Sequence, residues 1–257
     1  MSSQFAVGDR VLLLDRKGRR YMITLAAGGE FHTHAGWVRH DDVVGQTEGT
    51  TVRSTSGSAY LTVRPTLADF VLKMPRGAQV IYPKDLGAIL ILADIFPGAR
   101  VLEAGVGSGA LSMTLLRAGA DVVGYELRAD FAARARANVA SFLGQDALSR
   151  FRVEERDVYD GIDESGFDRI VLDLPEPWRV IKHAETALRP GGLLVSYVPS
   201  VLQVAQLREG LEASAFGLAE TQEVLVRTWH VEGQAVRPDH RMVAHTGFLT
   251  AARLLQA

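Results

Sequence analysis

The sequence predicts an α/β protein in which a doubly wound, mostly parallel sheet follows a small N-terminal β-domain. Three observations support this prediction. Short β-rich runs, separated by turns that contain glycine, fill residues 1–64. Residues 81–257 alternate apolar strand candidates with helical segments, the pattern of a sheet covered by helices on both faces. A glycine-rich turn from Gly105 to Gly109 follows the first of these strands.

The composition limits the class of protein. Of the 257 residues, 47% are hydrophobic and 23% are charged, which is ordinary for a globular chain with a full core. No apolar run approaches the roughly 20 residues that span a bilayer, and the first residues lack the pattern of a signal peptide. The chain has no cysteine, which excludes a disulfide framework and a thiolate metal site. We therefore expect a cytoplasmic protein.

Charge is distributed unevenly along the chain. The net charge is −2, yet residues 1–84 contain 11 Lys or Arg against 7 Asp or Glu. A basic front third on an acidic body suits a phosphate backbone that lies across one face only. An uneven scatter of solvated charge explains the same counts equally well.

The N-terminal elements follow from local patterns. Strand candidates at 11–14, 21–25 and 59–63 predict a small β-barrel-like domain or compact sheet over residues 1–64. Residues 65–80 are predicted to form a linker helix and loop. Their apolar residues fall at helical spacing, and Thr66 with Asp69 matches a capping box.

The third region, residues 81–257, alternates its elements. We predict strands at 101–104, 122–126, 151–153, 169–173 and 193–198 and helices at 130–143 and 200–215. The last segments, 223–229 and 241–254, are predicted to be antiparallel edge strands joined by a long connection that contains Pro238.

The glycine-rich turn lies between an apolar strand and the start of a helix. Glycines let the backbone approach a ligand closely, and a helix N-terminus offers free N–H donors. Dinucleotide-binding domains use a related turn, so this signal alone is weak. The G-x-G-x-G spacing, with Glu103 before it, favours S-adenosylmethionine, because this ligand has an ammonium group and no pyrophosphate.

Acidic residues end successive strands behind this turn. Glu126 ends the next strand, where an acid in nucleotide-binding folds accepts hydrogen bonds from ribose hydroxyls. Asp157 follows the third strand, where it could accept a hydrogen bond from an adenine amino group. Each acid alone is more often a solvated strand end. Together with Glu103 they predict a cofactor site.

A further acid, Asp173, follows the apolar strand at 169–173 and begins the segment D-L-P-E-P-W. It lies at the carboxyl edge of the predicted sheet, where open α/β folds bind ligands. The prolines restrict the backbone, which helps to fix a side chain. A helix cap is the alternative, but a cap does not need so stiff a loop. With an ordinary pKa of ~3.9, the carboxylate is expected to be ionised and able to stabilise a cationic base.

These motifs together resemble those of the bacterial tRNA (adenine-58-N1)-methyltransferase family over most of the chain. The glycine turn is generic to methyltransferases, whereas the Tyr-Pro-Lys-Asp, D-L-x-x-P-W and H-T-G-F-L segments are more specific. The residues that carry the resemblance are F-H-T-H-A-G at 31–36, I-Y-P-K-D at 81–85, the turn at 101–111, Y-E at 125–126, D-L-x-x-P-W at 173–178, R-P at 237–238 and H-T-G-F-L at 245–249.

The resemblance implies a class I (Rossmann-like) methyltransferase domain that uses S-adenosylmethionine, a tRNA substrate and a homotetramer. It implies that Asp173 is the catalytic carboxylate and that Tyr82 lies by the donor and the target base. Tyr197 and Gln203 match positions near the substrate. Phe131 departs from the family pattern, because relatives often carry a polar residue there. The cofactor contacts implied are Gly105, Gly107, Ser108, Gly109, Ala110, Leu111, Glu126, Phe131, Asp157 and Asp173.

Three other functions compete with this interpretation. A nicotinamide-dependent oxidoreductase predicts G-x-G-x-x-G spacing and gives Asp173 no role. A non-catalytic tRNA-binding subunit would have lost the acids that this chain keeps. A methyltransferase of the same fold could act on another RNA position or on a protein carboxylate. No metal is expected, because nothing completes a geometry around His32 and His34.

Overall fold

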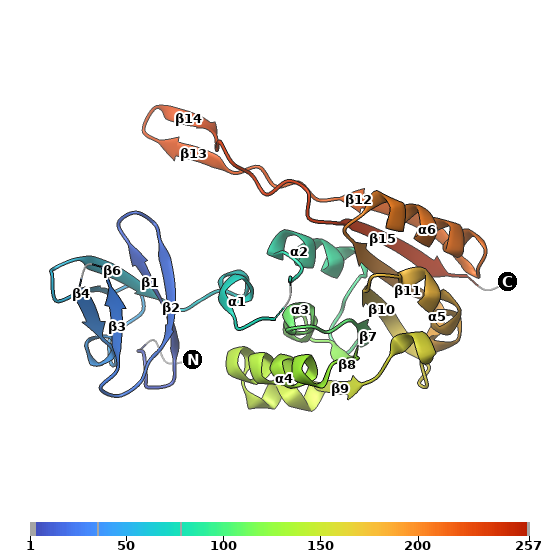
Figure 1. The fold of residues 1–257 in the computed structure, drawn as a ribbon, viewed down its shortest axis with the longest axis horizontal. Helices are drawn as coiled ribbons and strands as arrows, with labels where there is room; N and C mark the ends of the chain where they lie inside the picture. The colour runs from blue at the N-terminus through green and yellow to red at the C-terminus, as the bar shows by residue number, and fades with distance from the viewer. Residues whose placement is uncertain (1–3, 35, 78, 256–257) are drawn as a thin grey trace. The chain divides into compact units, whose positions relative to one another are not determined.

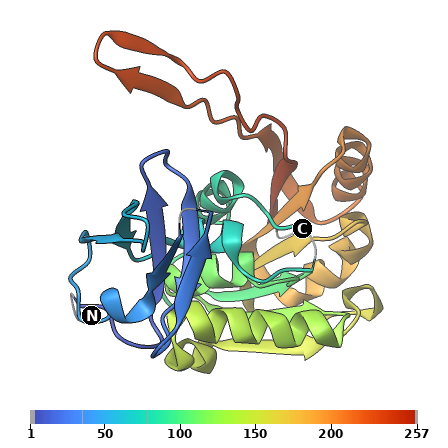
Figure 2. The same ribbon diagram turned by 60° about the vertical axis from the view of Figure 1, so that its left-hand side comes forward.

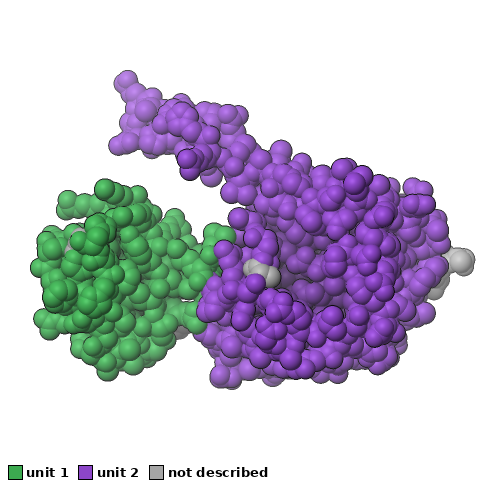
Figure 3. Space-filling model, viewed as in Figure 1, with its two compact units in different colours: residues 1–73 green, residues 74–257 purple. Residues whose placement is uncertain are grey.

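The computed structural model describes residues 4–34, 36–77 and 79–255. The chain forms two compact units, Met1–Lys73 and Met74–Ala257, coloured separately in Figure 3. The division falls inside the expected linker at 65–80. Helix α1 (Leu67–Lys73) belongs to the first unit, where it buries Phe70 beneath the Arg10 guanidinium at 4.6 Å. Thr66 and Asp69 form the expected capping box, with reciprocal hydrogen bonds of 3.1 and 3.2 Å between backbone N–H and side chain.

The first unit is built on a four-stranded antiparallel sheet in the order β2-β1-β6-β5. Its strands are β1 (Arg10–Asp15), β2 (Arg20–Thr24), β5 (Thr51–Arg53) and β6 (Ala59–Val63). A separate hairpin pairs β3 (Glu30–Thr33) with β4 (Gly36–Arg39), and the short helix η1 (His40–Asp42) follows. Val11, Leu13 and Tyr60 alternate inward into a core with Leu25 and Val38, which confirms the predicted compact β-domain.

The second unit contains a seven-stranded sheet in the order β12-β15-β11-β10-β7-β8-β9 (Figure 1). Five strands run parallel, so their carboxyl ends meet at one edge of the sheet. They are β7 (Arg100–Ala104), β8 (Asp121–Glu126), β9 (Phe151–Glu155), β10 (Phe167–Asp173) and β11 (Leu188–Val198). β12 (Phe216–Glu223) and β15 (Phe248–Leu254) complete the sheet as an antiparallel pair.

Helices cover both faces of this sheet, and its central strands are therefore buried on both sides. One layer holds α2 (Pro83–Leu92), α3 (Ala110–Arg117) and α4 (Ala129–Leu143), and the other holds α5 (Ile181–Ala187) and α6 (Val201–Glu212). The short helices η2 (Gln145–Arg150), η3 (Val158–Asp160) and η4 (Pro177–Val180) lie in the loops between strands and helices. The described helices include none long and apolar enough to cross a membrane.

The end of the chain corrects one prediction. A strand was expected at 223–229. The structure instead has β12 at Phe216–Glu223, because this alternating segment pairs with β15. Residues 224–247 instead form an arm that projects from the sheet (Figure 2). Within the arm, β13 (Trp229–Glu232) and β14 (Ala235–Pro238) form a hairpin, so Pro238 ends a strand rather than lying in an irregular connection.

Candidate active site

The glycine-rich turn packs directly on the strand that carries Asp173. Gly105 has φ +86°, and a Cβ atom there would lie 2.1 Å from the Asp173 carbonyl oxygen, so only glycine fits. Gly109 adopts the left-handed conformation that starts α3 and lies against Ala135. The backbone N–H of Gly107 donates to Glu126 Oε2 at 2.8 Å. The turn is thereby held between the ends of β8 and β10.

Two cavities open on either side of this turn and share Gly105 and Asp173 in their walls. The larger, of about 290 Å³, is also lined by Glu126, Asp157 and Pro175. The smaller, of about 20 Å³, is lined by Glu103, Val80 and Ile81 together with the rest of the turn, namely Val106, Gly107, Ser108, Ala110 and Leu111. The structure thus brings the predicted turn and all the predicted acids to one concave site at the carboxyl edge.

Burial changes the acids from their expected state. It raises the pKa of Asp173 to about 7, and the Glu126 carboxylate adds to that rise. It raises the pKa of Glu103 to about 8, with Asp173 adding to the effect against a hydrogen bond from Ser112. The expectation that Asp173 keeps an ordinary pKa was therefore wrong. A buried acid near another acid keeps its proton to a higher pH, and an approaching positive charge favours its ionised form.

Several polar atoms at this site have no partner among the described residues. Glu103 Oε1 and Ser108 Oγ are buried without a hydrogen bond, and none of the ion pairs formed by the described residues includes Glu103, Glu126, Asp157 or Asp173. Unpaired buried acids are costly, and native proteins satisfy them with a partner or a ligand. The site therefore fits a ligand that carries positive charge and hydrogen-bond donors, as S-adenosylmethionine does.

The predicted substrate residues Tyr197, Tyr82 and Gln203 come from three different segments of the second unit. Tyr197 lies opposite Asp173 in the pairing of β10 with β11 and donates to the Thr246 carbonyl oxygen at 2.6 Å. Burial raises its pKa to about 12, so its hydroxyl stays protonated. A Cβ atom on Gly247 would lie 2.4 Å from the ring, so glycine makes room for it. Tyr82 is the residue before α2, and both Asp85 and Leu86 donate to its carbonyl oxygen.

Gln203 lies where both ends of its amide are engaged. Its Oε1 accepts from Ser200 N at 3.1 Å in the capping box of α6, and its Nε2 donates to the Pro175 carbonyl oxygen at 2.8 Å. It therefore ties α6 to the D-L-P-E-P-W loop. Phe131 is buried beneath the Arg128 guanidinium at 4.1 Å, and the walls of the two cavities do not include it.

The sequence prediction gave no role to a buried polar network beside these tyrosines. Lys84 Nζ donates to Asp85 Oδ1 at 2.8 Å, to Thr246 Oγ1 at 2.5 Å and to the Val224 carbonyl oxygen at 2.6 Å. Thr246 in turn donates to Asp85 Oδ2 at 2.6 Å. The network joins the start of α2, next to Tyr82, to both ends of the arm. Its signal in the sequence was the pair of motifs Tyr-Pro-Lys-Asp and H-T-G-F-L.

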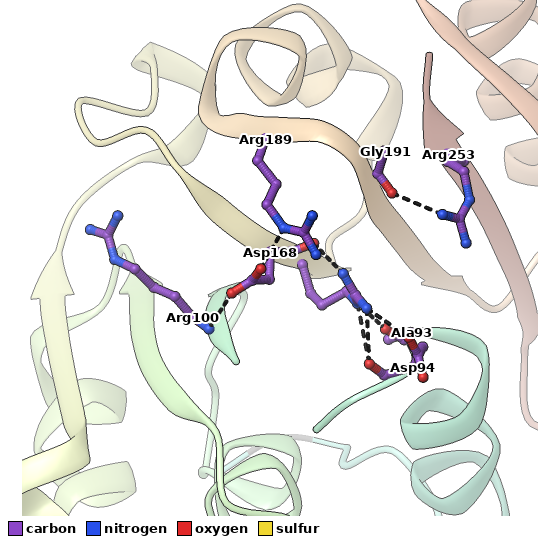
Figure 4. Close-up of polar contacts among 8 residues, drawn as sticks. Ala93, Asp94, Arg100, Asp168, Arg189, Gly191 and Arg253 are labelled. Carbon is purple, nitrogen blue, oxygen red and sulfur yellow. Dashed lines mark hydrogen bonds and ion pairs between the residues drawn. The ribbon is translucent and has the colours of Figure 1, made fainter. Parts of the chain in front are cut away.

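The opposite, amino edge of the same sheet has a different character (Figure 4). There Asp168 pairs with Arg189 and accepts from the backbone N–H of Arg100 at 2.9 Å. Arg169 pairs with Asp94 at 2.8 Å and donates to the Asp168 carbonyl oxygen. Each acid drawn in this view has an arginine partner. The described residues also contain no group of three or more His, Asp or Glu able to hold a metal ion.

Comparison with protein families agrees with this geometry. Residues 58–237 match the model described as "tRNA methyltransferase complex GCD14 subunit", and residues 4–52 match "TrmI-like N-terminal". The chain is 40% identical over 250 residues to a tRNA (adenine(58)-N(1))-methyltransferase TrmI of Thermus thermophilus, covering 96% of this chain and 97% of the relative. It is 35% identical to a tRNA (adenine(57)-N(1)/adenine(58)-N(1))-methyltransferase TrmI of Methanocaldococcus jannaschii, covering 95% and 94%.

Solved structures give the same fold. A SAM-dependent O-methyltransferase from Thermotoga maritima matches with a TM-score of 0.94 and 31% identity, covering 99% of this chain and 96% of that one. The tRNA (m1A58) methyltransferase TrmI from Aquifex aeolicus matches with a TM-score of 0.88 and 29% identity, covering 99% and 100%. The family models and the identity to these relatives show that the chain belongs to the tRNA (adenine-58-N1)-methyltransferase family and is an S-adenosylmethionine-dependent enzyme.

Proposed function

We propose that this protein transfers the methyl group of S-adenosylmethionine to N1 of adenine 58 in the T-loop of tRNA. One observation carries the proposal. At the carboxyl edge of the sheet, the glycine turn and a set of acids without cationic partners line one site, and Asp173 lies at its centre. Family membership supports tRNA as the methyl acceptor.

The donor would be held by the turn and the acids around it. Gly105, Gly107, Ser108, Gly109, Ala110 and Leu111 supply backbone and a buried hydroxyl, while Glu103 faces the small cavity. Glu126 already accepts from Gly107 N and Arg128 N, and its remaining lone pairs can accept from ribose hydroxyls. Asp157 uses Oδ1 to cap η3 and keeps capacity at Oδ2 for an adenine amino group. We assign Phe131 a supporting role, packed beneath Arg128.

The bound donor supplies an electrophilic methyl group on a positively charged sulfur. A positive charge in contact with Asp173 stabilises its ionised form and lowers the pKa that burial has raised. The carboxylate can then accept a hydrogen bond from the adenine N6 amino group, orient the base and stabilise the cation formed by N1 methylation. Tyr82 and Tyr197 would form the walls for the extruded base, and Gln203 would keep the loop of Asp173 in place.

Self-association into a homotetramer is part of the proposal. In the arm hairpin, Trp229 pairs opposite Pro238 and Val231 opposite Val236, so these four apolar side chains share one face. Trp229, Val231 and Val236 are more than half exposed. An isolated two-stranded hairpin is marginally stable in water, and a second copy of the chain would cover this face. Val231→Asp with Val236→Asp should reduce the mass measured by light scattering. An unchanged mass would contradict an interface through the arm.

The reaction is tested by nucleoside mass spectrometry of tRNA incubated with the protein and S-adenosylmethionine. We expect 1-methyladenosine from an unmodified transcript and none from a matched transcript with guanine in place of adenine 58. The Asp173→Asn variant serves as the control for a contaminating enzyme. Equal methylation of the two transcripts would contradict the assigned position, and a different methylated nucleoside would contradict the assigned acceptor atom.

A further inference from the structure

The first unit carries a further cavity, far from the candidate active site in sequence, at the tip of the hairpin between β1 and β2. Its volume is about 360 Å³, and its wall includes Arg16, Lys17 and Arg19 from this hairpin. The turn at 56–58 and His34 form the other side, where Ser56 and Ser58 add hydroxyl groups. Among the described residues of the wall, Asp15 is the one acid.

The Asp15 carboxylate is hydrogen-bonded within the turn. Its Oδ1 accepts from the backbone N–H groups of Lys17 and Arg19, both at 2.9 Å, and its Oδ2 accepts from Arg19 Nε at 2.6 Å. Gly18 supplies the left-handed residue, with φ +74°, that a tight turn needs. The carboxylate therefore fixes the backbone and pairs with Arg19, and it leaves the charges of Arg16 and Lys17 uncompensated.

The positive charge of the unit is concentrated at this tip. Residues 1–73 contain nine Lys or Arg and seven Asp or Glu, and four of the nine basic residues lie within 16–20. Arg19 pairs with Asp15 and Arg20 with Asp69. Arg16 and Lys17 are exposed, and neither has an ion pair within the part of the chain that the structure describes. Nearly half of the basic residues of the first unit therefore lie in one turn.

We propose that this cavity binds a phosphate of the tRNA backbone, held by Arg16 and Lys17 with the hydroxyls of the facing turn. The inference rests on the proposed function. Guanidinium, ammonium and hydroxyl donors on one concave wall are the groups that bind phosphate oxygens. Apart from Ala59 and the buried Tyr60, the described residues of the wall are polar, charged or glycine, so the wall favours a phosphate group over an apolar ligand.

The test measures tRNA affinity as a function of salt. Each phosphate contact contributes roughly 0.7 to 0.9 to the slope of log affinity against log salt. The Arg16→Gln, Lys17→Gln double variant should reduce that slope by about 1 to 2 relative to the unaltered chain. A conservative Arg16→Lys, Lys17→Arg exchange should keep it. The matched control is Arg117→Gln with Lys182→Gln, which removes the same charges from exposed positions in the second unit and should leave the slope unchanged.

The outcomes separate this site from the proposed function. If the unaltered chain forms 1-methyladenosine but the Arg16, Lys17 variant keeps its salt slope, the cavity does not contact the backbone. An equal loss in the control variant would likewise overturn the site, because net charge alone would explain it. Binding of phosphatidylserine vesicles that depends on Arg16 and Lys17, with an unchanged tRNA slope, would assign the cavity to a lipid headgroup instead. Failure to methylate tRNA at all would contradict the proposed function, whatever the slope.

Discussion

Acidic side chains at the two edges of the seven-stranded sheet differ in whether they have a cationic partner. At the amino edge, Asp168 and Asp94 each contact an arginine, and these pairs are complete within the chain (Figure 4). At the carboxyl edge, Glu103 is buried and Asp173 is half-buried, and both have raised pKa values and no cationic partner among the described residues. The acids of the amino edge therefore contribute to stability, whereas those of the carboxyl edge are available to a ligand. A buried acid left without a partner marks the place that a positive group from outside is to fill.

The largest expected effect is on the chemical step. Asp173→Asn keeps the shape and a carbonyl acceptor but loses the charge that balances the methylated base. We expect single-turnover methylation at saturating donor to fall by ~10²–10⁴-fold, the range of a positioned acid–base group. Asp168→Asn, the matched change at the amino edge, should leave the rate near that of the unaltered chain. If Asp173→Asn methylated tRNA as fast as Asp168→Asn and the unaltered chain, Asp173 would have no role in the chemical step and would be a structural residue.

The second effect is on stability and has the opposite sign. The folded chain holds a proton on Asp173 up to about pH 7, whereas the unfolded chain releases it near the ordinary value of 3.8. The contribution of Asp173 to stability therefore falls as the pH rises from about 4 to 7. Asp173→Asn lacks this loss, so its free energy of unfolding should exceed that of the unaltered chain by up to about 4 kcal/mol above pH 7. Urea denaturation at a series of pH values checks this, and a difference independent of pH would contradict it.

A third, smaller effect concerns donor binding. Because Glu126 also accepts from two backbone N–H groups, Glu126→Gln is a better probe than alanine, since it keeps one acceptor for the loop. Loss of a charged acceptor should weaken S-adenosylmethionine binding by about 1.5–3 kcal/mol, or roughly 10- to 150-fold. Calorimetry measures this directly. Glu164→Gln, which removes an acid paired with Arg100 and Arg152 on the amino side, should bind the donor normally.

The smallest effect belongs to the amino edge itself. Asp168→Asn removes the partner of Arg189 but keeps an oxygen for the Arg100 backbone N–H. We expect a loss of about 1 kcal/mol in the free energy of unfolding, since the ion pair is partly solvated. Donor affinity should not change. A variant that lost donor binding without losing stability would show that the two edges are not separate in function.

Those features of the site that depend on residues close together in the sequence could be predicted. The glycine turn and the acids at strand ends are set by residues close in the chain, and parallel strands bring their carboxyl ends together. What could not be predicted depends on contacts between distant segments. The raised pKa of Asp173 arises from burial and from Glu126, 47 positions earlier in the sequence. The Lys84 network joins three segments, so each part alone looked like an ordinary polar residue.

The fold shows the same limit. Parallel strands with long apolar runs were found within a few residues of their ends, because they are buried on both faces. The edge strand Phe216–Glu223 was misplaced because its alternating polar residues are a weaker signal than the apolar run that follows it. The short strands β3, β4 and β5 were missed, since three or four residues give little periodicity. Pairing with neighbours, rather than local preference, decides such strands.

The network around Lys84 sets a limit on how this protein can be redesigned. Lys84 and Asp85 are nearly inaccessible to solvent, and they close on Val224 and Thr246, the two points where the arm leaves the sheet. The arm is therefore modular at its tip but not at its root. The hairpin at 229–238 could be trimmed, exchanged or fused to another protein while the residues beside Tyr82 keep their contacts. Deleting residues 224 and 246 would leave the buried Lys84 and Asp85 without these hydrogen-bond partners. It would also remove the Thr246 carbonyl oxygen that accepts the hydrogen bond from Tyr197.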